Sequence, residues 1–266
     1  MWRAGGRLNA ITRGTGSPRA IWRGIRNALS RRLRVRPLPA QEGYRLWSET
    51  YDTEDNVLAT LEEEIFSAFL GGASLAGKTV FDIGCGTGRH WAELARRQPR
   101  ELHGVDSSPE MLSRLRARFP DAQLHLRSEE TIQQFGGGCA DLVVSTLMLA
   151  HVREVDVELG AWARLLKTGG EIILTDFHPE ALRAGMRTTF ANRGATFEIE
   201  NHIHSVKEME SIFRALNLEV ISRRERTLDS TVRASYERQN RMDVYQKGFG
   251  KQLVIGFRLR KAGEVR

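Results

Sequence analysis

The sequence predicts an α/β domain with a doubly wound, mostly parallel sheet of seven strands. Short apolar strand patterns alternate with helix-length patterns between residues 79 and 176, which is typical of parallel strand–helix units. A glycine-rich turn follows the first of these strands, at the place where such folds bind a nucleotide. Two late strand patterns lack a clear helix between them, and they predict an antiparallel pair at one edge of the sheet.

The expected elements begin with a helix that Thr53 caps, because acidic residues fill its first turn. The first strand is expected at Thr79–Ile83, and the helix after it carries Trp91 and Leu94, with His90 on its surface. The strands and helices that follow are expected in this order: strand 101–105, helix 109–119, strand 122–126, strand 142–146, helix 154–166 and strand 171–176.

The pattern is looser beyond residue 176. A short strand is expected at residues 197–203, and Ser205 with Glu208 forms a capping box that begins the next helix. The last two strands are expected at residues 218–226 and 252–260. The segments between these elements, residues 179–204 and 228–250, are expected to form a small cap over the domain, and we call them the cap segments.

The charge distribution separates an N-terminal extension from the domain. The chain has 266 residues, with 40 Lys+Arg and 33 Asp+Glu. Ten arginines and no lysine precede the first acidic residue, Glu42, so residues 42–266 hold 30 basic and 33 acidic residues. A nucleic-acid-binding surface on the domain is therefore not supported. The two cysteines fit a reducing, cytoplasmic compartment, and no apolar run reaches the ~18 residues of a membrane span.

Residues 1–41 form the basic N-terminal extension. Ser17 and Pro18 have the residue types that begin a helix, and apolar residues then recur at helical spacing as far as Pro37. A basic amphipathic helix of this kind suits an anionic membrane surface or a partner, and an arginine-rich leader is also typical of a mitochondrial transit peptide. A solvated leader and an arm packed on this or a neighbouring subunit are the alternatives.

The glycine turn at residues 84–88 is the strongest functional signal. Gly84, Gly86 and Gly88 permit a tight turn and the close approach of a ligand to the main chain. Asp106 follows 18 residues after Gly88, at the end of the second strand, where a carboxylate accepts hydrogen bonds from ribose hydroxyls. These features predict a nucleotide-containing cofactor.

Three details of the turn favour S-adenosylmethionine over a nicotinamide dinucleotide. The spacing is G-x-G-x-G instead of G-x-G-x-x-G. Asp82 would repel a pyrophosphate, and the first basic residue, Arg89, follows the last glycine. A ligand with a cationic amino group and a sulfonium suits this acidic turn better.

The combination of motifs resembles a class I S-adenosylmethionine-dependent methyltransferase, and most closely the ubiquinone/menaquinone-type small-molecule branch with its Rossmann-like fold. The resemblance covers roughly residues 44–260. The segments that carry it are residues 81–88, residues 106–111, residues 140–144 and residues 166–176.

The resemblance implies a set of cofactor contacts. The methionine part is expected to lie against the glycine turn, at Asp82, Gly84, Cys85 and Gly86. The ribose is expected on Asp106, and the adenine between Ser107 and Met111. The family often has Gly-Asp-Ala after the third strand, and this chain has Ser128-Glu129-Glu130 there, so Glu129 is the best match for an adenine contact and Glu130 the alternative. Leu147 is expected to close over the methionine part.

Residues 44–52 resemble the Trp-x-x-x-Tyr-Asp segment of this branch, in which aromatic side chains lie over the cofactor. Trp47 and Tyr51 are four residues apart and would share one helix face. Tyr51 is therefore expected to contact the cofactor or the substrate, although an ordinary aromatic pair in the core has the same pattern.

Histidines are expected where the strand ends meet the cap segments. His178 follows the fifth strand and His151 the fourth, and both are candidate proton acceptors. His202 and His204 precede the capping box, where a structural role is expected. The spacing of these histidines does not predict a metal site.

The expected activity is methyl transfer to a small, partly apolar acceptor through an oxygen, carbon or nitrogen atom. One alternative is a carboxyl methyltransferase acting on a carrier-bound acyl chain, with Arg183, Arg187 and Arg193 supplying a basic groove. Another is a non-methylating module that binds the cofactor, or a cyclase.

Overall fold

The computed structural model describes residues 37–128 and 131–263. The expected tail helix and the expected adenine contacts Glu129 and Glu130 lie outside the described residues.

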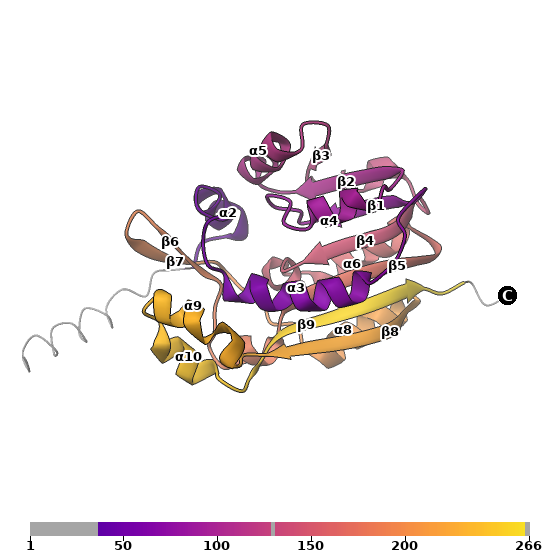
Figure 1. The fold of residues 1–266 in the computed structure, drawn as a ribbon. Helices are drawn as coiled ribbons and strands as arrows, with labels where there is room; N and C mark the ends of the chain where they lie inside the picture. Colours follow the sequence, from indigo (N-terminus) through magenta and orange to yellow (C-terminus); the bar gives the residue numbers. More distant parts are fainter. Residues whose placement is uncertain (1–36, 129–130, 264–266) are drawn as a thin grey trace, which may run out of the picture. The chain divides into compact units, whose positions relative to one another are not determined.

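The predicted seven-stranded sheet is confirmed, with the strand order β3-β2-β1-β4-β5-β9-β8 (Figure 1). The first five strands are parallel, and β9 runs antiparallel to both β5 and β8. The strands are β1 Thr79–Ile83, β2 Glu101–Asp106, β3 Gln123–Leu126, β4 Ala140–Thr146, β5 Leu166–Phe177, β8 Leu218–Thr227 and β9 Gln252–Lys261.

Helices cover both faces of the sheet. The longer helices are α2 Ala40–Trp47, α3 Val57–Leu70, α5 Pro109–Arg118, α6 Val155–Leu165 and α8 Val206–Ala215. The shorter helical segments are α4 Trp91–Arg96, η1 Gln133–Phe135, η2 Leu149–His151, α7 Pro179–Arg183, η3 Ser230–Val232, α9 Arg233–Arg238 and α10 Met242–Gly248. None of the helices in the described part of the chain is both long and apolar enough to cross a membrane.

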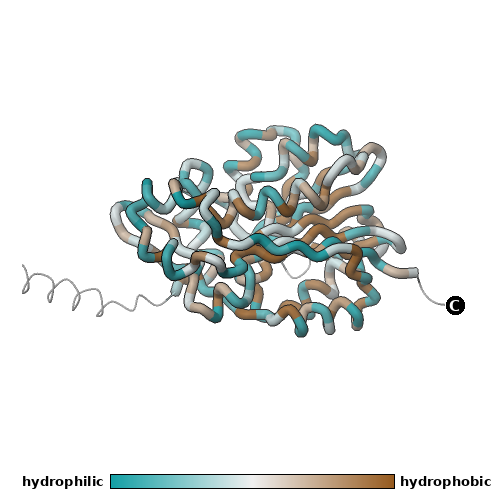
Figure 2. Tube along the Cα trace, turned by 60° about the horizontal axis from the view of Figure 1, so that its bottom comes forward, coloured by the Kyte–Doolittle hydropathy of each residue, from teal (hydrophilic) through white to brown (hydrophobic). Residues whose placement is uncertain are grey.

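The sheet separates two hydrophobic cores. Successive residues of a strand point to opposite faces, so Val80 packs under α3 while Phe81 packs with α6 and α8. Phe66 and Trp162 are fully buried on the two sides. Figure 2 shows hydrophobic residues gathered along the inner strands of the sheet and hydrophilic residues on the peripheral segments.

The first helix after α2 begins later than predicted. Asn56 has extended backbone angles, and its side chain accepts the Ala59 N–H at 3.2 Å, so Asn56 is the N-cap of α3. The hydroxyl of Thr53 instead donates to the Thr50 carbonyl at 2.9 Å within a turn. The expected cap at Thr53 is therefore wrong by three positions.

The cap segments contain more regular structure than predicted. Instead of a strand at residues 197–203, β6 Thr189–Asn192 and β7 Ala195–Glu198 form an antiparallel hairpin. Its two turn residues, Arg193 and Gly194, have φ of 49° and 81°, which fits the twist of a two-residue hairpin turn. The second cap segment folds into η3, α9 and α10.

Helix α2 and the elements of the two cap segments gather at one end of the sheet. Figure 1 shows α2, the β6–β7 hairpin, α9 and α10 at the end toward which β1, β4 and β5 point. Loops at the carboxyl ends of parallel strands are where ligands bind in open α/β sheets. The fold therefore places the glycine turn and the cap segments at one edge.

Gly256 of β9 is expected to tolerate no side chain, because a Cβ there would lie 2.6 Å from Ile65 Cγ2 and 2.7 Å from Phe69 Cε2. Gly256→Ala should lower the free energy of unfolding by about 1–3 kcal/mol, the usual cost of overpacking. Urea denaturation measures this change. Gly72→Ala is the control, because its Cβ would meet no atom within 4 Å. Equal stability of the two variants would contradict the packing of α3 on β9.

Candidate active site

The glycine turn is packed on one side and open on the other. Gly84, Gly86 and Gly88 all have positive φ, at 76°, 53° and 81°. A Cβ on Gly84 would lie 2.6 Å from Met148 Cγ, whereas a Cβ on Gly86 would meet no atom within 4 Å. The open space at Gly86 lets a ligand reach the main chain, which fits the expected cofactor.

The carboxylate of Asp106 is held in place by main-chain amides. Oδ2 accepts the Gly86 N–H at 2.8 Å and Oδ1 accepts the Ser108 N–H at 2.8 Å. Burial raises the pKa of Asp106, and these amide hydrogen bonds oppose the rise. Each oxygen keeps a lone pair for a ribose hydroxyl. The nearby Ser107 is exposed, and Met111 is buried at the start of α5.

Asp82 is a buried acid at the end of β1. Burial raises its pKa to about 7, against the opposing charge of Arg89. A cationic amino group would stabilise the ionised form. The adjacent Cys85 is also buried, and burial raises the pKa of its thiol well above the ordinary value. Cys85 is therefore a neutral spacer in the turn and not a reactive thiolate.

A buried ion-pair network supports the turn from behind. Glu62 of α3 is fully buried and pairs with Arg89, and it accepts hydrogen bonds from His90 Nε2 at 3.0 Å and Thr175 Oγ1 at 2.7 Å. Burial alone would raise the pKa of Glu62, but the charge of Arg89 and these hydrogen bonds lower it to about 2. The pattern analysis missed this network because its members lie on three separate elements.

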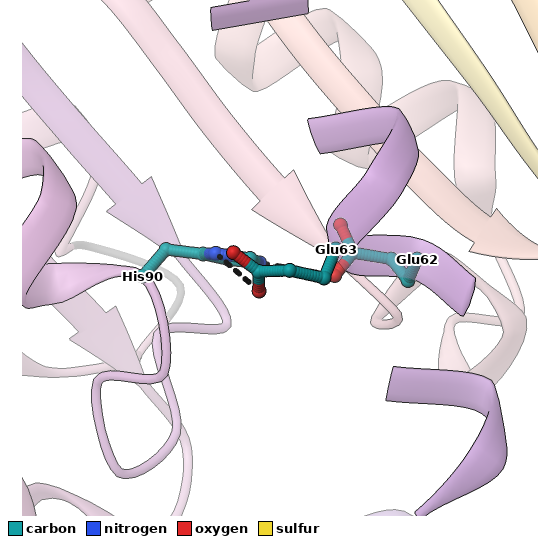
Figure 3. Close-up of side chains that lie close together, drawn as sticks. All are labelled: Glu62, Glu63 and His90. Carbon is teal, nitrogen blue, oxygen red and sulfur yellow. Dashed lines mark hydrogen bonds and ion pairs between the residues drawn. The ribbon is translucent and has the colours of Figure 1, made fainter. Parts of the chain in front are cut away.

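His90 lies between two carboxylates of α3, with Nδ1 3.5 Å from Glu63 Oε2 (Figure 3). Its ring stacks on Phe66 at a centroid distance of 3.7 Å, so the expected surface position is wrong. One atom from each of Glu62, Glu63 and His90 lies within 4.8 Å of the others. Arg89 already supplies the positive charge that balances Glu62, so we assign an ion-pair network here and no metal.

A cavity of about 730 Å³ lies at the carboxyl ends of β4 and β5, and residues 82–88 are not among those that line it. Its walls come from α2, the loops after β4 and β5, and both cap segments. Leu147 lines it with a positive φ of 55°, and its N–H donates to the Thr175 carbonyl at 2.8 Å. Drug-sized ligands occupy pockets of about 300–1,000 Å³. The cavity therefore has room for the reactive end of a cofactor together with a small acceptor.

Aromatic side chains form the α2 side of the cavity. Trp47 packs edge-on against Tyr51 at 4.9 Å and stacks on Phe190 of the hairpin at 5.2 Å. Tyr51 lines the cavity, and its burial raises the pKa of the phenol. The aromatic segment thus joins α2 to the first cap segment over the site.

Tyr44 and His151 form a hydrogen-bonded pair in the cavity wall, with Tyr44 Oη 3.0 Å from His151 Nε2. His151 Nδ1 lies 2.8 Å from the Glu200 carbonyl oxygen, so Nδ1 carries the proton and Nε2 accepts from Tyr44. Burial lowers the pKa of His151 to about 4, so the ring is neutral at pH 7. Tyr44 was not predicted as a site residue, although it begins the aromatic segment.

Asp176 is another site residue that the sequence analysis missed. It is the penultimate residue of β5, lines the cavity, and accepts the N–H groups of Ala150 and Phe177 at 2.6 Å each. Burial raises its pKa to about 7. An acidic residue at the carboxyl end of a central parallel strand was the available signal.

The expected placement of His178 at the ligand crevice is wrong. Its Nδ1 accepts the Glu180 N–H at 3.1 Å as the N-cap of α7, and its Nε2 lies 3.7 Å from Glu225 Oε1. The side chain does not line the cavity. Both ring nitrogens are occupied, so His178 holds α7 against β8. His204 Nε2 bonds the Val152 carbonyl at 2.7 Å, in keeping with a structural role.

Comparison with known proteins identifies the domain. Residues 58–223, more than half of the chain, match the family described as Methyltransferase domain. An uncharacterized methyltransferase of Emericella nidulans is 28% identical over 183 residues, which is 55% of this chain and 64% of the relative. A ubiquinone biosynthesis O-methyltransferase of Nitrosococcus oceani is 28% identical over 156 residues, 57% of this chain and 64% of the relative. The chain thus spans less than two thirds of the length of these relatives.

Solved structures share the fold at low identity. An S-adenosylmethionine-dependent methyltransferase from Mesorhizobium loti has a TM-score of 0.58 at 17% identity, covering 75% of this chain and 97% of its own. Geranyl diphosphate C-methyltransferase from Streptomyces coelicolor has a TM-score of 0.58 at 16% identity, covering 77% and 79%. These likenesses show the architecture alone.

The affinity for S-adenosylhomocysteine is expected to fall as the pH drops below about 7. The amino group of the ligand is cationic and needs Asp82 ionised, and a proton competes for the carboxylate below its pKa of about 7. Well below the pKa, the affinity should fall by about tenfold per pH unit, because ligand binding displaces one proton. Calorimetry between pH 5.5 and 8.5 measures this, and Asp82→Asn should flatten the profile. If Asp176→Asn flattens the profile and Asp82→Asn does not, Asp176 is the titrating acid and the assignment to Asp82 is wrong.

His178→Ala should lower stability and leave ligand binding intact. Loss of an N-cap acceptor costs about 0.5–2 kcal/mol, and α7 also loses its contact with Glu225. Chemical denaturation measures the first effect and S-adenosylhomocysteine titration the second. His178→Asn should recover part of the stability, because asparagine is a good N-cap. A tenfold loss of affinity for S-adenosylhomocysteine in a folded variant would show that His178 belongs to the binding site.

Proposed function

The chain belongs to the methyltransferase-domain family, and we propose that it transfers a methyl group from S-adenosylmethionine to a small acceptor held under the cap segments. The observation that carries the proposal is the placement of two features at one sheet edge. The open glycine turn with its fixed Asp106 lies at the ends of β1 and β2, and the cavity lies at the ends of the neighbouring strands β4 and β5.

The bound cofactor would supply a methyl group on a sulfonium, whose leaving group is a neutral thioether. Asp106 would hold the ribose, and Asp82 would face the cationic amino group. Tyr51 would present an aromatic ring to the positive end of the ligand, a favourable contact for a cation. The chain's contribution is then largely the alignment of two reactants at about 3–3.5 Å.

The Tyr44–His151 pair would orient the acceptor. His151 Nε2 accepts a hydrogen bond from the Tyr44 hydroxyl, so the phenol oxygen keeps lone pairs for an O–H or N–H of the acceptor. With a pKa of about 4, His151 is a weak base at pH 7. The pair therefore serves better to position the acceptor than to remove its proton, since efficient bases have a pKa near the working pH.

A small acceptor is favoured over a carrier-bound chain. The basic groove expected for an acidic carrier is partly neutralised, because Arg187 lies 3.6 Å from Glu198 and Arg193 lies 3.4 Å from Glu49. One relative is named as an O-methyltransferase of ubiquinone biosynthesis, and a hydroxyl acceptor suits the Tyr44 oxygen.

Methyl transfer is tested with S-adenosylmethionine carrying a tritiated methyl group, incubated with fractionated cell extract. The label is expected in the small-molecule fraction. Asp106→Ala should weaken S-adenosylhomocysteine binding at least tenfold, because hydrogen bonds to a charged acceptor contribute about 1.5–3 kcal/mol each. Label in the protein or RNA fraction would contradict a small acceptor. Intact binding without any transfer would indicate a non-methylating binder or cyclase.

Tyr44→Phe is expected to lower kcat up to about tenfold, since it removes one hydrogen bond to the acceptor. Affinity for S-adenosylhomocysteine should change less than about twofold. Steady-state kinetics on the labelled acceptor measures the first quantity. Tyr245→Phe is the matched control, because Tyr245 is buried in α10 and does not line the cavity. If the two variants have equal kcat, Tyr44 does not contact the acceptor and its assignment to the site is wrong.

A further inference from the structure

The wall of the cavity that the cap segments build carries cationic side chains. Arg187 precedes β6, Arg241 precedes α10, and Lys247 lies in the last turn of α10. All three line the same cavity as Tyr44 and His151. Cations in a cavity wall either neutralise nearby carboxylates or bind an anionic ligand.

The carboxylates that line the cavity are already engaged. Glu54 accepts from Trp47 Nε1 and Thr50 Oγ1 at 2.9 Å each, and Asp55 pairs with Arg238.

The two remaining carboxylates are engaged as well. Asp176 accepts two main-chain amides, and Glu198 lies 3.6 Å from Arg187. Arg187 therefore has an internal partner, and no lining carboxylate is left for the other two cations.

Arg241 and Lys247 have no acidic partner within the described ranges. One guanidinium nitrogen of Arg241 donates to Thr189 Oγ1 at 3.3 Å, and its other donors have no partner there. Lys247 Nζ lies near Gly185, 3.4 Å from where a Cβ would stand. Cations elsewhere in this cap segment do pair: Arg233 with Glu237 at 2.8 Å, and Arg238 with Asp55 at 2.5 Å.

We propose that the methyl acceptor carries an anionic group, a carboxylate or a phosphate, which binds Arg241 and Lys247. The planar fork of Arg241 suits two oxygens of such a group, and Lys247 adds a compact charge. With the anionic end held at the cap, the opposite end of the acceptor reaches Tyr44 and His151. The proposal rests on the proposed function, because it assigns this cavity to the acceptor.

The test uses inorganic phosphate as the probe, observed by ³¹P line broadening on the full chain in chloride buffer of constant ionic strength. Arg241→Gln and Lys247→Gln should each weaken phosphate binding about tenfold, as expected for a lost charged hydrogen bond. Arg233→Gln and Lys251→Gln are the matched controls, since both residues lie outside the cavity lining. These controls should broaden the phosphate line as the unchanged protein does.

Competition with hexanoate separates the two sources of negative charge. If hexanoate displaces phosphate at lower concentration than phosphate itself binds, the acceptor is a carboxylate. If it does not, the acceptor is a phosphate ester. Absence of broadening by the unchanged protein, or equal broadening by all four variants, overturns the proposal.

Calorimetry with S-adenosylhomocysteine on the same samples keeps the two claims apart. Ligand binding without a phosphate site rejects the anionic acceptor and leaves the proposed function standing. A phosphate site sensitive to Arg241 and Lys247, without ligand binding, rejects methyl transfer and retains the anion site.

Discussion

The buried carboxylate of Glu62 is the interaction on which the arrangement of the site depends. It joins α3 to Arg89 and His90 after the glycine turn and to Thr175 of β5, so one side chain fixes three elements at the carboxyl edge of the sheet. Loss of one partner of a buried ion pair costs about 3–5 kcal/mol, because the other charge is left without compensation. Arg89 also opposes the rise in the pKa of Asp82, which links this network to the cofactor side of the site.

The glycine turn and the second cap segment carry charges of opposite sign. Asp82 and Asp106 lie at the glycine turn, whereas Arg241 and Lys247, which lack an acidic partner among the residues described, lie in the second cap segment. A cationic donor and an acceptor with a negative group would be drawn to opposite ends, and their reactive atoms would meet between them near Tyr44. The same polarity disfavours a pyrophosphate at the turn, where it would meet two carboxylates.

Local sequence patterns predicted the sheet well and the acceptor side poorly. The strands at Thr79–Ile83 and residues 101–105 and the capping box at Ser205 depend on neighbours within one element, so spacing reveals them. The turn with Asp106 joins two consecutive strand ends that are 20 residues apart, and its glycine motif with the spaced acid was recognisable in the sequence. The pair of Tyr44 and His151 spans 107 residues and arises only when α2 folds over the end of β4. The prediction for His178 was wrong because the sequence shows that the residue follows β5 but does not show which way its side chain points. In the structure its two ring nitrogens contact the Glu180 N–H at the start of α7 and the carboxylate of Glu225.

The low pKa of His151 bears on how this site would select its substrate. A neutral, weakly basic ring that only holds Tyr44 gives little preference for acceptors that must lose a proton, so a hydroxyl, an amine or an ionised oxygen would react by the same alignment. Discrimination must then come from binding at the far end of the acceptor. The β6–β7 hairpin, α9 and α10 form the cavity wall at that end, and none of these elements belongs to the seven-stranded sheet. Changes in these cap segments can alter the acceptor without disturbing Asp82, Asp106 or the Glu62 network that supports them.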